Sequence, residues 1–136
     1  KVPELRTVMN DLAGRSITDE MLVRKTVVDS VLDLEAIDGR FLEAYGRLLP
    51  FGVGNPRPLF LAEKVEVAGA PRLMKGKHIK FLGRQGNRVF EVIGWDMAEA
   101  AEKLVQGTKF DLVYTINQNE FRGESRTDLI IEDYRI

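Results

Sequence analysis

A run of glycine and proline residues between positions 49 and 60 constrains the fold more than any other part of the sequence. It reads Leu-Pro-Phe-Gly-Val-Gly-Asn-Pro-Arg-Pro-Leu-Phe, a composition that neither a helix nor a strand accommodates. Apolar residues before the run recur at helical spacing, whereas those after it alternate as in strands. We therefore expect a helical and extended linker segment over residues 1–58 and a β-rich domain over residues 59–136. The expected hinge residues are Gly52, Gly54, Asn55, Pro56 and Pro58.

The segment before the hinge is expected to hold two helices with an extended stretch between them. Apolar residues from Leu5 to Leu12 follow the spacing of a short amphipathic helix, which Gly14 should end. Residues 26–34 are rich in valine and aspartate and read as extended. Asp38 is placed to cap a second helix, and Pro50 stops it.

The β-rich part predicts a five-stranded OB-fold barrel. The expected strands cover residues 59–67, 72–82, 88–95, 110–116 and 126–134. Asp96 and Glu99 have the spacing of a capping box, which predicts a helix between the third and fourth strands. The fold class is therefore mainly β with flanking helices, and few small folds share this order of elements. An OB-fold binds oligonucleotides or oligosaccharides on the face of its second and third strands.

Basic residues are concentrated on the predicted second and third strands. The whole chain is nearly neutral, with 20 basic and 21 acidic residues, so its overall charge names no partner. Residues 71–95 nevertheless contain a single acidic residue, Glu91, and six basic residues. The basic residues are Arg72, Lys75, Lys77, Lys80, Arg84 and Arg88. A local basic patch of this kind can bind phosphates, but a solvated sheet edge also carries lysines. The position of the patch on the OB-fold face favours nucleic acid.

Three further positions have both a structural and a binding interpretation. The predicted loop over residues 117–125 contains Phe121 and Arg122, which could contact a base and a phosphate, or could simply pack over the barrel end. His78 is either a phosphate or base contact or a solvated side chain. Trp95 is expected to pack in the core or against the helix rather than to stack on bases.

The composition argues against catalysis by this chain. With one histidine and no cysteine, a metal cluster rich in histidine or a thiolate site is excluded. Carboxylates near the end of the chain make only a weak candidate for a metal site. We therefore expect no catalytic residue, metal site or cofactor. No apolar stretch reaches the length of a membrane span, and the lack of cysteine fits a cytoplasmic protein.

The motifs of the chain resemble a family of nucleases. Residues 50–60 resemble the Pro-Phe-Gly-x-Gly-Asn-Pro-x-Pro-x-Phe signature of RecJ-type single-strand-DNA-specific exonucleases. Residues 76–80, Gly-Lys-His-Ile-Lys, are similar to the family's Gly-Lys-His-Leu-Lys segment. Residues 119–123 and 129–133 are similar to its closing Asn-x-aromatic-x-Gly and hydrophobic-Glu-Asp patterns.

This resemblance implies a 5′→3′ exonuclease that degrades single-stranded DNA with Mn²⁺ or Mg²⁺, in DNA recombination and in mismatch and base-excision repair. In that family the DHH and DHHA1 domains catalyse cleavage, and their Asp-His-His and Gly-Gly-His motifs have no counterpart here. The chain therefore reads as a fragment that starts in the last helix of a DHHA1 domain. The resemblance assigns candidate DNA contacts first to Lys77, His78 and Lys80, and then to Phe121 and Arg122. Glu120 and Glu124 flank this loop and are a departure from the family pattern, because their negative charges weaken its attraction for phosphate.

Two functions remain open at this point. The first is a single-stranded-DNA-binding module of a RecJ-type exonuclease, with Arg57 in the hinge as a minor additional contact. The second is a protein-interaction or scaffolding OB-fold that docks on the catalytic DHH and DHHA1 domains or on a single-strand-binding protein.

Overall fold

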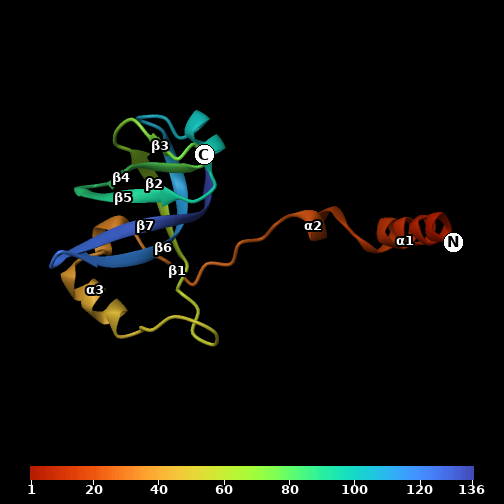
Figure 1. The fold of residues 1–136 in the computed structure, drawn as a ribbon, viewed down its shortest axis with the longest axis horizontal. Coiled ribbons are helices and arrows are strands. Elements are labelled where there is room, and N and C mark those ends of the chain that lie inside the picture. The colour runs from red at the N-terminus through yellow and green to blue at the C-terminus, as the bar shows by residue number, and fades with distance from the viewer.

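The computed structural model describes the backbone of residues 1–136 and every side chain except that of Phe121. Its N-terminal part, α1 (Val2–Ser16) and α2 (Asp19–Leu22), has no buried residue and lies away from the rest of the molecule. An extended stretch, residues 23–29, joins it to the β-rich part (Figure 1). The predicted end of the first helix at Gly14 is wrong: Ile17 N–H still bonds the Ala13 carbonyl, so the glycine stays helical.

Five strands form a closed ring, which confirms the OB-fold. They are β2 (Phe60–Val67), β4 (His78–Gln85), β5 (Arg88–Gly94), β6 (Lys109–Phe121) and β7 (Glu124–Arg135). The ring runs β2–β4–β5–β7–β6 and closes again on β2. All neighbours are antiparallel except β5 and β7, which are parallel. Closure turns one face of every strand inward, where the apolar side chains make the core.

Two short strands extend the ring and correct the predicted boundaries. β1 (Ser30–Val31) pairs in parallel with β2, so only two residues of the expected extended stretch 26–34 form a strand. β3 (Arg72–Met74) pairs antiparallel with β4, so the single strand expected over residues 72–82 is wrong. The chain reverses between them because Lys75 and Gly76 both take positive φ, 50° and 65°, which glycine accommodates readily.

The helix predicted after the third barrel strand is only a 3₁₀ turn, η2 (Ala98–Glu102). Asp96 does not cap it: that residue has φ 53°, and its N–H donates to His78 Nδ1 at 2.9 Å. The capping-box prediction is therefore wrong, because the backbone of Asp96 is used in the turn that leads away from β5. Two apolar residues of the turn region, Ala100 and Leu104, are nevertheless buried in the core.

Residues before the glycine-proline run share the barrel core. Leu34 of η1 (Leu34–Ala36) and Tyr45 of α3 (Gly39–Gly46) are buried in it, as is Ile37 between the two elements. Asp38 caps α3 as predicted, with its carboxylate accepting from Phe41 N–H at 2.8 Å. Tyr114 in β6 donates its hydroxyl to the Leu32 carbonyl at 2.8 Å. Burial, and secondarily the charge of Asp33, raises the pKa of the Tyr114 phenol.

The end of the β6–β7 hairpin differs from the predicted loop over residues 117–125. The strands stay paired as far as Phe121 and Glu124, and only Arg122 and Gly123 connect them. Both connecting residues have positive φ, 54° and 81°, the geometry that lets two residues close a hairpin. The expected loop is therefore wrong, and its polar residues belong to strands instead.

The hinge run folds into a compact turn. Gly52 and Asn55 exchange two backbone hydrogen bonds, of 2.9 and 3.1 Å, and Gly54 has φ 82°. The Asn55 amide donates to the carbonyls of Leu48 and Pro50 at 2.8 and 2.9 Å, which ties the turn to the end of α3. These bonds explain why a glycine and an asparagine stand at these positions.

Candidate nucleic-acid interface

A groove lies on the outer face of β4, where an OB-fold binds its ligand. Because side chains alternate along a strand, Lys80 and Leu82 point outward while Ile79 and Phe81 point into the barrel. The groove has a volume of about 670 Å³. It is lined by residues 69–74 of the β3 region and by Lys80, Phe81, Leu82 and Glu91. A hollow with apolar walls and charged side chains can hold both the bases and the phosphates of a strand.

Four of the six predicted basic residues are exposed and have no ion pair within the part of the chain that the structure describes. They are Arg72, Lys75, Lys77 and Arg88. Arg72 lines the groove, and the turn with Lys75 and Lys77 connects β3 with β4. An exposed cation without a partner keeps its full charge for an incoming phosphate.

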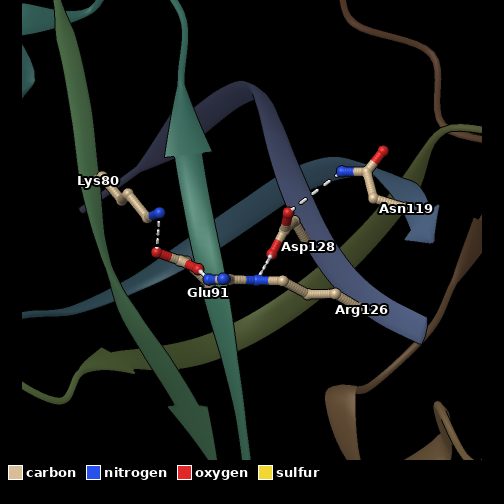
Figure 2. A network of polar contacts seen from close by, with 5 residues as sticks. All are labelled: Lys80, Glu91, Asn119, Arg126 and Asp128. Carbon is tan, nitrogen blue, oxygen red and sulfur yellow. Dashed lines mark hydrogen bonds and ion pairs between the residues drawn. The ribbon is translucent and has the colours of Figure 1, made fainter. Parts of the chain in front are cut away.

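The other two predicted basic residues already have acidic partners. Arg84 Nη2 lies 2.7 Å from Glu66 Oε1 of β2. Lys80 pairs with Glu91 of β5, and Glu91 also contacts the guanidinium of Arg126 in β7 (Figure 2). These partners reduce the positive charge that Lys80 and Arg84 present.

The ion pair of Lys80 belongs to a network that crosses four strands (Figure 2). Arg126 Nε donates to Asp128 Oδ1 at 3.0 Å, and the Asn119 amide donates to Asp128 Oδ2 at 3.5 Å. The carboxylates of Glu91 and Asp128 are only 15% and 8% exposed. The sequence did not predict this network, because Arg126 meets Glu91 of β5 and Asn119 meets Asp128 of β7 only once the strands pair.

His78 and Trp95 lie together at one end of this face. The His78 ring is 18% exposed and its Nδ1 accepts the Asp96 N–H. The indole of Trp95 stands against it with ring centroids 4.9 Å apart and planes at 74°. Trp95 is 53% exposed, so the expected core packing is wrong: the alternation of β5 continues past Gly94 and turns the indole outward.

The predicted contacts at the hairpin tip stay predictions. The side chain of Phe121 lies outside the described part of the structure. The backbone of Arg122 forms the turn between β6 and β7.

Arg57 of the hinge contacts the Phe51 ring and the backbone of β6. Its guanidinium lies 5.6 Å from the centre of the Phe51 ring, and Nη1 donates to the Ile116 carbonyl at 3.4 Å. A second hollow, of about 540 Å³, opens beside it between β6, β7 and the extended N-terminal stretch. Thr26 in its wall donates to Asp133 Oδ2 at 3.0 Å. The sequence did not predict this hollow, since residues far apart in the chain form it.

The described residues do not fit a Mn²⁺ or Mg²⁺ site. They contain no group of three or more histidine, cysteine, aspartate or glutamate side chains close enough to hold a metal ion. Asp128 is bonded to Arg126 and Asn119, which occupies its oxygens. None of the helices described is long and apolar enough to cross a membrane.

A family model described as the RecJ OB domain matches residues 28–133. The chain belongs to this family. The single-stranded-DNA-specific exonuclease RecJ of Bacillus subtilis (strain 168) is 28% identical over 133 residues. That match covers 97% of this chain but 17% of the relative, so the RecJ OB domain and its linker span a small part of the length of that enzyme.

Two solved RecJ structures from Thermus thermophilus have the same fold. The complex with Mn²⁺ matches with a TM-score of 0.69 at 21% identity, covering 98% of this chain and 19% of that one. The complex with Mg²⁺ matches with a TM-score of 0.66 at 22% identity, covering 98% and 20%. At these identities the likeness establishes the fold.

Proposed function

We propose that this chain is the single-stranded-DNA-binding module of a RecJ-type exonuclease. The observation that carries the proposal is the groove on β4, bordered by exposed cations that have no ion pair among the described residues. In this proposal Arg72, Lys75 and Lys77 contact phosphates along one strand, and the sugars and bases lie over the apolar wall. Such contacts tolerate any sequence, because they use the backbone and the π-face that every base has.

In this proposal the whole protein is a metal-dependent 5′→3′ exonuclease of DNA repair and recombination. Two observations support it: the family match and the relative described as specific for single-stranded DNA. The chain itself supplies binding and no cleavage, since its described residues do not fit a metal site. Cleavage then belongs to catalytic domains elsewhere in the full-length protein.

A salt titration tests the binding function. The chain is titrated into a fluorescently labelled single strand of about 12 nucleotides, within the usual site size of an OB-fold, and anisotropy is followed at several salt concentrations. We expect the affinity to fall steeply with salt, and a Lys75→Glu, Lys77→Glu variant to flatten the slope by about 0.7 for each lost phosphate contact.

The control is Arg6→Glu, a charge reversal on α1 away from the barrel (Figure 1). It should leave the slope unchanged. No detectable binding at low salt contradicts the proposal. Equal affinity for a duplex of the same length contradicts strand discrimination.

The exposed apolar face of α1 favours a second function, docking on the catalytic domains of the same protein. Leu5, Val8, Met9 and Leu12 share one face of the helix and are all exposed, an arrangement typical of an interface. In this case the chain binds the separately produced catalytic part, and Leu5→Asp with Met9→Asp abolishes that binding. A chain that binds this part but no oligonucleotide supports docking over DNA binding.

A further inference from the structure

The indole of Trp95 is half exposed at the end of β5, where it packs against His78 rather than in the core. Tryptophan side chains are largely buried on average, whereas this one is 53% exposed. It follows β5 directly and contacts the ring of His78, whose strand partner in β3 is Met74. The lining of the groove includes Met74 but neither ring, so the His78–Trp95 pair adjoins the groove through Met74, next to the β3–β4 turn.

His78 is the ring against which the indole packs. The His78 ring is itself oriented by the Asp96 N–H, which donates to Nδ1 at 2.9 Å. Its edge-to-face contact with Trp95, at 74°, then restricts the rotation of the indole. A ring that is already oriented loses less conformational entropy when a ligand packs on it.

Two cations lie in the turn that leads into His78. The turn that connects Met74 with His78 carries Lys75 and Lys77, which are exposed and have no ion pair among the described residues. A bonded turn positions them, because Lys77 N–H donates to the Met74 carbonyl at 3.1 Å. An aromatic face next to unpaired cations is the combination that binds a base and its phosphate together.

We propose that Trp95, oriented by His78, is a stacking platform for one unpaired base at the end of the groove. This inference rests on the proposed single-strand binding and adds a source of strand selectivity to it. A base in a duplex is already stacked and paired, so it is not available to the indole. A single strand offers its bases freely, and stacking contributes about 1–3 kcal/mol per base.

The fluorescence of the chain provides a direct measurement, because Trp95 is its one tryptophan. We expect tryptophan emission to be quenched when the chain is titrated with oligothymidine of about 12 nucleotides. An abasic oligonucleotide of the same length carries the same phosphates without bases. It should bind more weakly and leave the emission unchanged. A duplex of that length should also fail to quench it.

Substitutions separate stacking from charge. Trp95→Leu should weaken binding to oligothymidine about 5- to 150-fold, as the loss of one stacked base implies, and should leave binding to the abasic strand unchanged. Trp95→Phe keeps an aromatic face and should retain most of the affinity. Val53→Ala, which shortens an exposed apolar side chain at the tip of the hinge turn, is the matched control and should bind as the unmodified chain does.

The outcomes distinguish this inference from the function on which it rests. If the labelled strand binds by anisotropy while emission stays constant and Trp95→Leu binds normally, the platform is contradicted and the DNA-binding function stands. If no oligonucleotide binds at low salt, the function itself is contradicted. Equal quenching by single strand and duplex contradicts base stacking. Circular dichroism of each variant shows whether its fold is intact, and the emission titration of the unmodified chain preserves the test should Trp95→Leu unfold.

Discussion

Glu91 lies between two basic residues, Lys80 of the groove and Arg126 of the neighbouring strand β7. Its carboxylate pairs with Lys80 of β4 and Arg126 of β7, and it is 15% exposed (Figure 2). A phosphate of bound DNA would have to compete with this carboxylate for both cations. We expect Glu91→Gln to bind single-stranded DNA more tightly and with a salt slope steeper by about 0.7 for each additional phosphate contact.

The anisotropy titration described above measures this effect. Glu43→Gln is a suitable control, because it breaks an exposed Glu43–Arg47 pair of 3.0 Å on α3 and should change neither affinity nor slope. A folded Glu91→Gln variant with an unchanged slope would show that Lys80 and Arg126 do not meet DNA.

At the level of residues, the sequence identified the basic residues of the candidate site but not which of them form ion pairs. Arg72 and Lys75 have no ion pair among the described residues, whereas the neighbouring Lys80 does. The difference arises in three dimensions, since Glu91 reaches Lys80 only because β5 pairs with β4. The outward turn of Trp95 was missed for a similar reason: both faces of its strand are apolar in sequence, so alternation could not identify the inner one.

Strand β4 depends on a glycine where the ring closes. Gly83 pairs with Val67 of β2 on one side and with Phe90 of β5 on the other. A Cβ at this position would lie 2.8 Å from Val92 Cγ2, closer than packed carbon atoms allow. We expect Gly83→Ala to lower the free energy of unfolding by about 1–3 kcal/mol through overpacking, measured by urea denaturation.

The chain offers a matched control for this substitution. Gly69 precedes β3, and a Cβ there would meet nothing within 4 Å. Gly69→Ala should therefore leave stability nearly unchanged. Equal losses of stability in the two variants would mean that close packing against Val92 is not the reason for a glycine at position 83.

The elements that the sequence predicted best are those with a strong periodic pattern and a local signal. Asp38 caps α3 as expected, because an N-cap residue bonds only to backbone N–H groups in the first turn of the helix that it precedes. The strand break at Lys75 and the hairpin tip at Arg122 were missed, since both need a non-glycine residue at positive φ. Such a residue is uncommon and is stabilised here by strand pairing on either side.

On the scale of the whole molecule, the folding unit includes residues on both sides of the glycine-proline run. Leu34, Ile37 and Tyr45 are buried together with the barrel strands. Burying each such side chain contributes about 1.5–3 kcal/mol, and their sum is comparable to the total stability of a small domain, about 5–15 kcal/mol. We propose that the domain begins near residue 28, where the family match begins.

Two fragments test this boundary by thermal unfolding followed with circular dichroism. A fragment of residues 28–136 should unfold cooperatively, with a midpoint close to that of the full chain, because α1 and α2 bury none of their residues. A fragment of residues 59–136 should lack a cooperative transition. Cooperative unfolding of the shorter fragment would contradict the proposed boundary and support a boundary at residue 58.

The closed ring also determines how copies of the domain behave toward one another. An unpaired strand edge offers N–H and C=O groups to a strand of another chain, but the five ring strands pair in a cycle. The strands outside the ring, β1 and β3, are only two and three residues long. Open edges remain on the β6–β7 hairpin, where residues 117–120 and 124–127 are all polar or charged. Association of two copies through their strand edges is therefore disfavoured.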